Sequence, residues 1–389
     1  MKRCALNAVS ALILAVCSMD ALNTIAWATA PDLSIEELSL KEAPRPFRAG
    51  IFRLGPALDQ EKTLGLSDGV GWATASGKLI IGSPDRNSIA AFDTDTQQPR
   101  WWNPVSAPPT AQITVFGDHL IMGLRNGSIQ KWEVATGKRV WEASLDTFTE
   151  RQTVLSGNIL LILTSTQMLY ALDFQSGKTL WLYDAGFPDG MTVRPGAAPI
   201  VYENEVIFGT AAGEVLGINL QAGKVLWRHN PSYKESRFHD VVGQLVVKDG
   251  RLLVTRYDGH VAAIDLSASS KQDFKSIWAD DLPSITASTF RDGRLYVGCI
   301  NGDVVAYDAS SGRRIWRSTT GQSVASITAL ESSVIIGGTD GRVTAIGAQS
   351  GEPTWHDDIN AEISTAPVLV NEHLFFATSL RNLYGYKIR

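Results

Sequence analysis

The chain has 389 residues, of which 44% are hydrophobic and 19% charged, and its formal net charge at pH 7 is −5. A mildly acidic chain argues against a nucleic-acid partner, which would require a basic face. Cysteine is too sparse for an expected intrachain disulfide in the mature protein, so we expect stability to come from a large apolar core.

The N-terminus carries the pattern of an export signal, in which Lys2 and Arg3 precede an apolar run from Ala5 to Val16. This run is too short for a stable membrane span. Loss of the two basic residues with the signal brings the formal net charge of the mature chain to about −7.

Two cleavage sites fit this signal. Ala26-Trp27-Ala28 offers small residues at the required spacing and predicts ordinary cleavage, which removes residues 1–28. Leu14-Ala15-Val16-Cys17 resembles the bacterial lipoprotein box, with valine where a small residue is usual, and predicts removal of residues 1–16 and lipidation of Cys17. The mature protein is therefore either anchored by lipid at Cys17 or soluble after export.

Residues 29–48 form a polar segment with three prolines, which predicts an extended linker before a folded domain at 49–389. A short partner-binding helix within 33–40 is the alternative. Gly50 to Ala57 reads as a single strand with no hairpin mate nearby.

The rest of the chain is organised by a repeat in which a glycine is followed four residues later by a tryptophan. Successive tryptophans lie 40, 40, 46, 51, 38 and 39 residues apart, and self-similarity near 40 residues is typical of propellers and other arrays. Two copies are degraded but remain in phase, and the seven tryptophans are Trp101, Trp141, Trp181, Trp227, Trp278, Trp316 and Trp355. An acidic or small polar residue lies eight positions before most of them, and we interpret this recurring residue as part of a turn.

Each unit predicts four short strands, as the segment from Ile113 to Leu145 illustrates. Its Asn126-Gly127 dipeptide suits a tight hairpin, because both residues tolerate a positive φ. The fourth strand carries Trp141, whose flat ring we expect to wedge against the neighbouring unit after the turn that Gly137 permits. Four-stranded units of about 40 residues are typical of propeller blades.

The C-terminal segment from Ile363 to Ile388 predicts three strands and no fourth. A ring of blades must close to remove its exposed edges, so we expect the strand at Gly50 to Ala57 to complete the last unit. The predicted fold is an all-β, eight-bladed β-propeller of four-stranded antiparallel blades, closed by an N-terminal strand in the last blade.

Unequal repeat lengths indicate the candidate binding site. The additional residues fall mainly at Asp184 to Gly196 and at His229 to Asp240, which are consecutive links between units and are expected on one face of the ring. Met191 and Val193 would offer an apolar anchor there, while Arg194 and the aspartate at 240 would supply opposite charges. In the alternative reading, the two apolar residues cover the blade below and the arginine pairs internally with the aspartate.

These two links resemble those of the BamB family, the propeller lipoproteins of the outer-membrane β-barrel assembly machinery. The likeness rests on the segments from Met191 to Pro199 and from Ser236 to Val242, within a similarity that spans roughly residues 49 to 389. It implies a non-enzymatic scaffold that docks onto periplasmic domains of BamA, aids the insertion of barrel proteins and carries a lipid anchor at Cys17. Unfolded outer-membrane proteins are a further expected partner.

The family positions match Met191, Val193, Arg194 and Asp240 as partner-binding residues, whereas Val242 departs from a second aspartate of the pattern. An enzyme is the rival class, because quinoprotein dehydrogenases use nearly the same tryptophan-ended repeat. We expect no catalytic residues, quinone cofactor or metal, since the chain has no adjacent cysteine pair and its six histidines are scattered without metal-ligand spacing. A general exported propeller that binds another protein or a glycan is the third alternative.

Overall fold

The computed structural model describes residues 47–53, 72–75, 79–82, 88–93, 99–149, 151–186, 192–193, 197–232, 236–267, 274–359, 361–363, 366–370, 373–378 and 382–387. The predicted signal, both cleavage sites and most of the predicted linker lie outside these residues. All the regular secondary structure in the described ranges is β-strand. None of these residues forms a helix long and apolar enough to cross a membrane.

The strands follow one another in groups of four after the first. The first seventeen are β1 (Phe47–Arg53), β2 (Trp72–Ala75), β3 (Leu79–Gly82), β4 (Ser88–Asp93), β5 (Pro99–Pro104), β6 (Pro109–Phe116), β7 (His119–Leu124), β8 (Ser128–Glu133), β9 (Arg139–Ser144), β10 (Val154–Ser156), β11 (Ile159–Leu163), β12 (Met168–Asp173), β13 (Thr179–Asp184), β14 (Ala197–Tyr202), β15 (Glu205–Gly209), β16 (Val215–Asn219) and β17 (Val225–His229). The remainder are β18 (Val241–Lys248), β19 (Arg251–Arg256), β20 (His260–Asp265), β21 (Ser276–Asp281), β22 (Ile285–Arg291), β23 (Arg294–Cys299), β24 (Asp303–Asp308), β25 (Arg314–Thr319), β26 (Val324–Ala329), β27 (Ser333–Gly338), β28 (Arg342–Gly347), β29 (Pro353–Asp358), β30 (Val368–Val370), β31 (His373–Ala377) and β32 (Asn382–Lys387).

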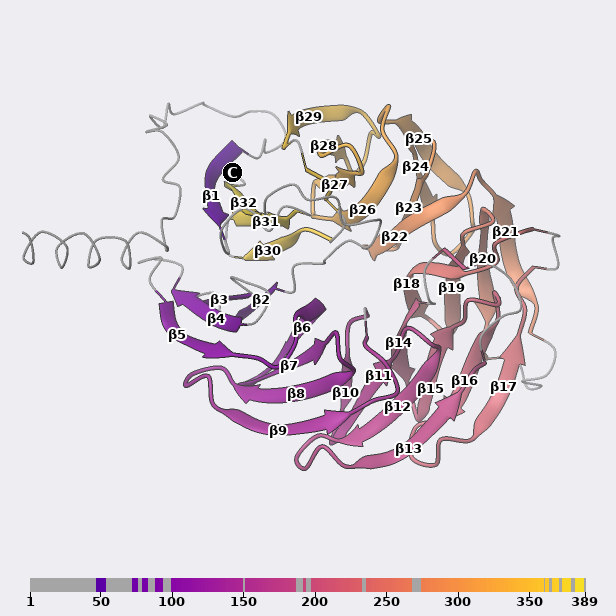
Figure 1. Cartoon of the computed structure of the whole chain (residues 1–389). Helices are drawn as coiled ribbons and strands as arrows, with labels where there is room; N and C mark the ends of the chain where they lie inside the picture. Colours follow the sequence, from indigo (N-terminus) through magenta and orange to yellow (C-terminus); the bar gives the residue numbers. More distant parts are fainter. Residues whose placement is uncertain are drawn as a thin grey trace, which may run out of the picture.

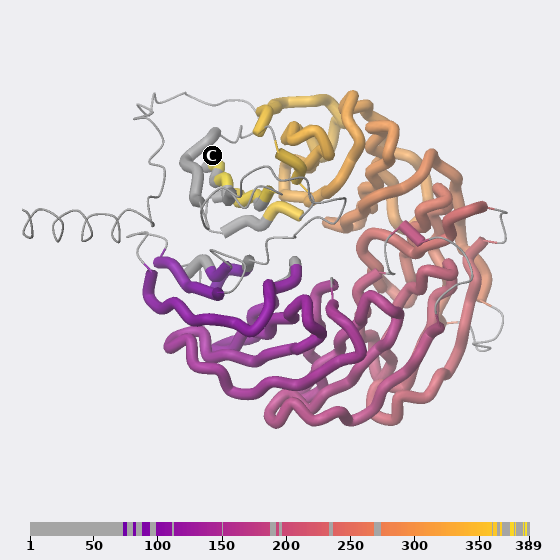
Figure 2. Tube along the Cα trace, viewed as in Figure 1, coloured from indigo at the N-terminus to yellow at the C-terminus, as the bar shows by residue number. Residues whose placement is uncertain are grey.

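These strands form a β-propeller in which the sheets follow one another around a common centre (Figure 1). Across the described ranges the strands form seven sheets, six of four strands and one of eight. The eight-stranded sheet consists of β2–β5 and β6–β9, joined by a parallel pairing of Trp72 with Gln112. The tube in Figure 2 shows the sheets following the order of the chain around the ring, from indigo through magenta and orange to yellow.

The last sheet has the order β1-β32-β31-β30, so an N-terminal strand lies in the same sheet as the three C-terminal strands. Those three strands were predicted. The first strand extends from Phe47 to Arg53 and pairs antiparallel with β32. It therefore begins three residues before the predicted start at Gly50 and crosses the predicted boundary between linker and propeller, while residues 54–57 lie outside the described ranges.

Five of the seven repeated tryptophans are seated on a glycine of the next unit along the chain. Trp141 donates a hydrogen bond from Nε1 to the Phe174 carbonyl oxygen at 3.0 Å. Its ring covers Gly177, where an added Cβ would lie 2.7 Å from the ring. The corresponding pairs, with the distance from an added Cβ to the ring, are Trp101 on Gly137 (2.5 Å), Trp181 on Gly223 (2.6 Å), Trp278 on Gly312 (2.5 Å) and Trp316 on Gly351 (2.7 Å). The glycine thus permits the turn and also leaves room for the preceding tryptophan.

Trp227 does not rest on a glycine of the next unit, because that unit has an insertion in place of the glycine turn. Its Nε1 instead donates to Glu205 Oε2 in its own sheet at 2.7 Å. Its ring packs edge to face on Phe274, with 4.7 Å between ring centroids. The contact between Trp227 and Phe274 therefore replaces the tryptophan–glycine contact between these two sheets.

The core lies between neighbouring sheets, and the two middle strands of each sheet supply most of it. All five residues of β11 are buried, whereas exposed and partly exposed residues alternate along the outer strand β13. One apolar cluster joins β11 and β12 to β15 and β16 of the next sheet. This packing explains why middle strands read as continuous apolar runs and outer strands as alternating ones.

The recurring acidic residues cap turns, as predicted. Asp173 Oδ1 accepts a hydrogen bond from the Ser176 amide at 2.7 Å. Asp308 Oδ1 accepts one from the Ser311 amide at 2.9 Å, and the hydroxyl groups of Ser310 and Ser311 also donate to it. Hydrogen bonds from these serines lower the pKa of Asp308 to about 2.

Candidate functional site

The two long links lie side by side. The first connects β13 to β14, and the second connects β17 to β18. The Val193 amide donates a hydrogen bond to Asp240 Oδ1 at 3.2 Å, which joins the first link to the end of the second. The structure thus brings together two of the residues predicted for the site, while Met191 and Arg194 lie outside the described residues.

The second link lies against the hairpins that connect the second and third strands of two sheets. The Val241 amide donates to the Thr210 carbonyl oxygen at 3.0 Å, and the Tyr257 amide donates to the Asp240 carbonyl oxygen at 2.8 Å. Thr210 directly follows β15 in the β15–β16 hairpin, and Tyr257 lies in the β19–β20 hairpin. Links and these hairpins therefore share one face of the propeller, as the alternation of strands predicted.

Val193 and Asp240 differ in their exposure to solvent. The Val193 side chain is exposed at 39%, which suits an apolar contact with a partner, whereas Asp240 has an exposed fraction of 0%. Asp240 was predicted to supply charge to a partner. In the structure its carboxylate instead accepts the Val193 amide and positions the first link.

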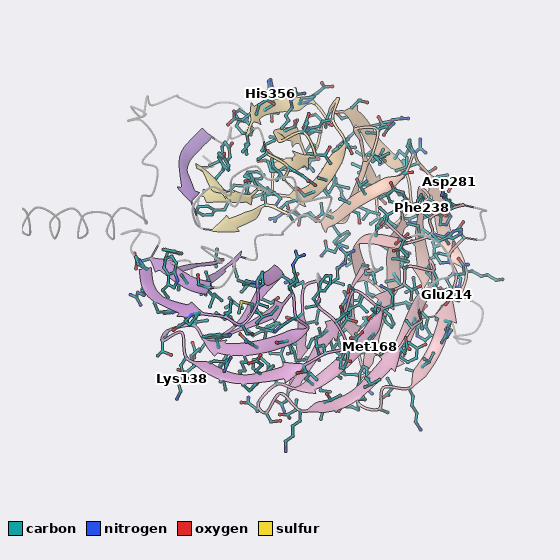
Figure 3. The ribbon with its side chains drawn as sticks, in the orientation of Figure 1. Lys138, Met168, Glu214, Phe238, Asp281 and His356 are labelled. Carbon is teal, nitrogen blue, oxygen red and sulfur yellow. The ribbon has the colours of Figure 1, made fainter. Side chains whose placement is uncertain are left out.

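The end of the second link contributes an aromatic and a cationic side chain. Phe238 packs edge to face on Tyr257, with 5.8 Å between ring centroids. Arg237 is exposed, and its Cζ lies 5.9 Å from the centre of the Phe238 ring. Phe238 lies near β18 in Figure 3, far from Lys138 at the outer rim of β6–β9. Arg237 and Phe238 were not predicted for the site, although both lie within the Ser236 to Val242 segment.

A buried ion pair lies beneath the second link. Arg256 Nη2 donates to Asp258 Oδ2 at 2.6 Å, and each side chain is only 1% exposed. At the start of the link, burial lowers the pKa of His229 and favours the neutral imidazole. No pattern in the sequence indicated that Arg256 is buried beneath the link, because its loop partners Asn230 and Ser232 lie 26 and 24 residues away along the chain.

The described groups at the two links are an exposed apolar side chain, an aromatic ring with an arginine beside it, and a buried polar support. Over the part of the chain that the structure describes, no group of three or more histidine, cysteine, aspartate or glutamate side chains is arranged to hold a metal ion.

A family model described as "Outer membrane protein assembly factor BamB" matches residues 85–299 and 300–389. The chain belongs to the BamB family. Among curated BamB proteins it is 25% identical over 244 residues to that of Moranella endobia, covering 59% of this chain and 61% of the relative. It is 23% identical over 256 residues to that of Yersinia pestis, covering 62% of this chain and 64% of the relative.

The matched region spans a little under two thirds of these BamB relatives. The crystal structure of BamB from Moraxella catarrhalis superposes with a TM-score of 0.74 at 19% identity, covering 88% of this chain and 100% of that chain, and so shares the fold. A shorter match, 32% identical over 107 residues, is to a quinoprotein ethanol dehydrogenase of Pseudomonas aeruginosa, covering 26% of this chain and 17% of the enzyme. The same repeat is therefore found in relatives of two functional classes.

Proposed function

We propose that this protein is a non-enzymatic scaffold subunit of the outer-membrane protein assembly machinery, which docks a BamA-like protein through its periplasmic domains. The docking surface consists of Met191, Val193 and Arg194 of the first link, with Asp240 of the second link as their support. The observation that carries this proposal is the hydrogen bond between the Val193 amide and Asp240, because it holds an exposed apolar side chain where two long links meet. Membership of a family described as outer membrane protein assembly factors supports this choice of partner.

The scaffold for this surface is proposed to be a closed ring of eight blades. The eight-stranded sheet then counts as two blades, because one parallel pairing joins two sets of four antiparallel strands. The pairing of β1 with β32 supports closure by the N-terminal strand. A closed ring is a rigid platform, and loops on rigid platforms bind with little loss of conformational freedom.

Each residue of the surface has a separate role in this proposal. The side chains of Met191 and Val193 are the apolar anchors, and Arg194 meets an acidic group of the partner. Asp240 fixes the Val193 backbone from below. The position where the family pattern places a second aspartate is occupied by Val242, which is 3% exposed in β18, so this chain relies less on polar contacts there.

Binding of a purified periplasmic domain of the BamA-like protein tests this function. We expect Arg194→Ala, or Met191→Ala combined with Val193→Ala, to weaken binding by about 2 kcal/mol or more, roughly 30-fold, because truncation of an interface anchor has this effect. The variants should keep the parental melting temperature.

The control is Lys138→Ala, an exposed residue in the hairpin between β8 and β9 on the opposite face. This variant should bind like the parent. Parental affinity of Arg194→Glu for the periplasmic domain would show that the docking surface lies elsewhere on the propeller.

A further inference from the structure

Arg256, at the end of β19, connects both ends of the second link. Its Nη1 donates to Asn230 Oδ1 at 2.8 Å and to the Ser232 carbonyl oxygen at 2.6 Å, near the start of the link. Its Nη2 lies 2.9 Å from His239 Nδ1, near the end of the link, and donates to Asp258 Oδ2 at 2.6 Å. One guanidinium thus joins two parts of a loop and the adjacent hairpin.

The contacts also assign a role to one ring nitrogen of His239. Because arginine only donates hydrogen bonds, His239 Nδ1 accepts from Arg256. Asp258 supplies the compensating charge, and its Oδ1 accepts the His260 amide at 3.3 Å. The side chains of Arg256 and Asp258 are both 1% exposed, so the two charges are removed from water together.

A buried ion pair is a poor source of stability alone, because desolvation of both charges offsets their attraction. The Arg256–Asp258 pair instead fixes the geometry of its surroundings, because a planar guanidinium requires acceptors at defined positions. Here three of those acceptors are loop groups, at Asn230, Ser232 and His239. The pair therefore suits a role in holding the loop in one shape.

The same contacts extend to the docking surface. His239 is followed by Asp240, whose carbonyl oxygen accepts the amide of Tyr257 at 2.8 Å, next to the arginine. The Asp240 carboxylate in turn holds the Val193 amide. Gly213 of the neighbouring hairpin packs closely against His239, because an added Cβ at Gly213 would lie 2.8 Å from the His239 carbonyl oxygen. A continuous series of contacts therefore leads from the buried guanidinium to the exposed valine.

We propose that Arg256 is a positioning residue for partner docking, which holds the second link through Asn230, Ser232 and His239 and thereby sets the place of Val193. This inference rests on the proposed docking function. It assigns a role in docking to a side chain that is only 1% exposed. Loss of the guanidinium should loosen the two links while the remainder of the propeller stays folded.

Hydrogen–deuterium exchange of the exported chain, together with binding of the periplasmic domain, tests this inference. In Arg256→Lys, which keeps the charge but loses the forked donors, we expect link amides at 229–240 and 192–197 to exchange roughly tenfold faster. Amides of the β27–β28 hairpin should exchange as in the parent. Binding of the periplasmic domain should weaken by about tenfold.

Two further variants keep the test decisive. Asn230→Ala removes one acceptor without leaving a buried charge unpaired, so it provides the measurement even if Arg256→Lys does not fold. Arg317→Lys is the control at a second arginine–aspartate pair, because Arg317 in β25 pairs with Asp303 at the start of β24 and is 51% exposed. It should change neither link exchange nor binding.

The outcomes separate this inference from the docking function. Parental link exchange in folded Arg256→Lys and in Asn230→Ala would overturn the positioning role, even where the Arg194 variants lose binding. Faster link exchange with parental binding would overturn it as well, since the loop would then be held without consequence for docking. Parental binding by the Met191, Val193 and Arg194 variants would overturn the docking function itself.

Discussion

At the scale of single residues, the repeat glycine has two functions, and the sequence indicated one of them. The turn was predictable because glycine tolerates a positive φ, and Gly177 has a φ of 72°. The contact between Gly177 and the Trp141 ring was not predictable, because the tryptophan and the glycine that it covers belong to different units. Asp240 illustrates the same difficulty, since nothing in a sequence shows that a loop carboxylate points inward to a neighbouring amide.

We expect Gly177→Ala to destabilise the propeller more than Gly157→Ala. Both glycines have a positive φ, so both alanines incur a backbone cost of about 1–2 kcal/mol. At Gly177 the new Cβ would also meet the Trp141 ring at 2.7 Å, whereas at Gly157 nothing lies within 4 Å. Overpacking against the Trp141 ring should add roughly 1–3 kcal/mol to the loss of stability in Gly177→Ala. Denaturant unfolding of the two variants measures the difference, and equal losses would contradict a role for the glycine as a seat.

At the scale of elements, the periodicity of tryptophans and the Asn-Gly and Asp-Gly turns predicted the four-stranded units well. The bounds of the first strand were predicted less well. Phe47 to Arg53 has no hairpin mate, and its register is fixed by β32, more than 300 residues later. Local patterns do not report a pairing of that separation, and so the predicted strand began three residues late.

Deletion of Phe47–Arg53 should destabilise the protein strongly, because it leaves the paired edge of β32 open to solvent and to other chains. We expect aggregation, or a melting temperature lower by about 10 °C or more, in a chain of several hundred residues. Deletion of residues 31–46 is the control and should leave melting nearly unchanged. Differential scanning calorimetry with light scattering measures both, and a parental transition without the strand would refute closure through this strand.

At the scale of the whole molecule, the fold alone does not select between scaffold and enzyme, since propellers with this repeat occur in both. Membership of the BamB family favours the scaffold, while the shorter match to a quinoprotein ethanol dehydrogenase keeps the enzyme as the rival class. Adding pyrroloquinoline quinone and calcium is the direct measurement. A ligand at a hundredfold excess over its Kd stabilises a fold by about 2.7 kcal/mol, which raises Tm measurably. We expect no rise in Tm and no dye-linked alcohol oxidation, and saturable quinone binding would restore the enzyme reading.

The position of the propeller in the envelope depends on the first residue of the mature chain. We propose that Cys17 is lipidated, so that the protein is held at the periplasmic face of the outer membrane with its links free to meet a membrane-bound partner. One acyl chain gives only marginal attachment, so stable anchoring needs more than one. We expect the exported protein to begin at Cys17, to carry several acyl chains by intact mass, and to partition into detergent, while Cys17→Ala should not. An unmodified mature chain that begins at Thr29 would mean that cleavage follows Ala28 and that the protein meets its partner as a soluble periplasmic subunit.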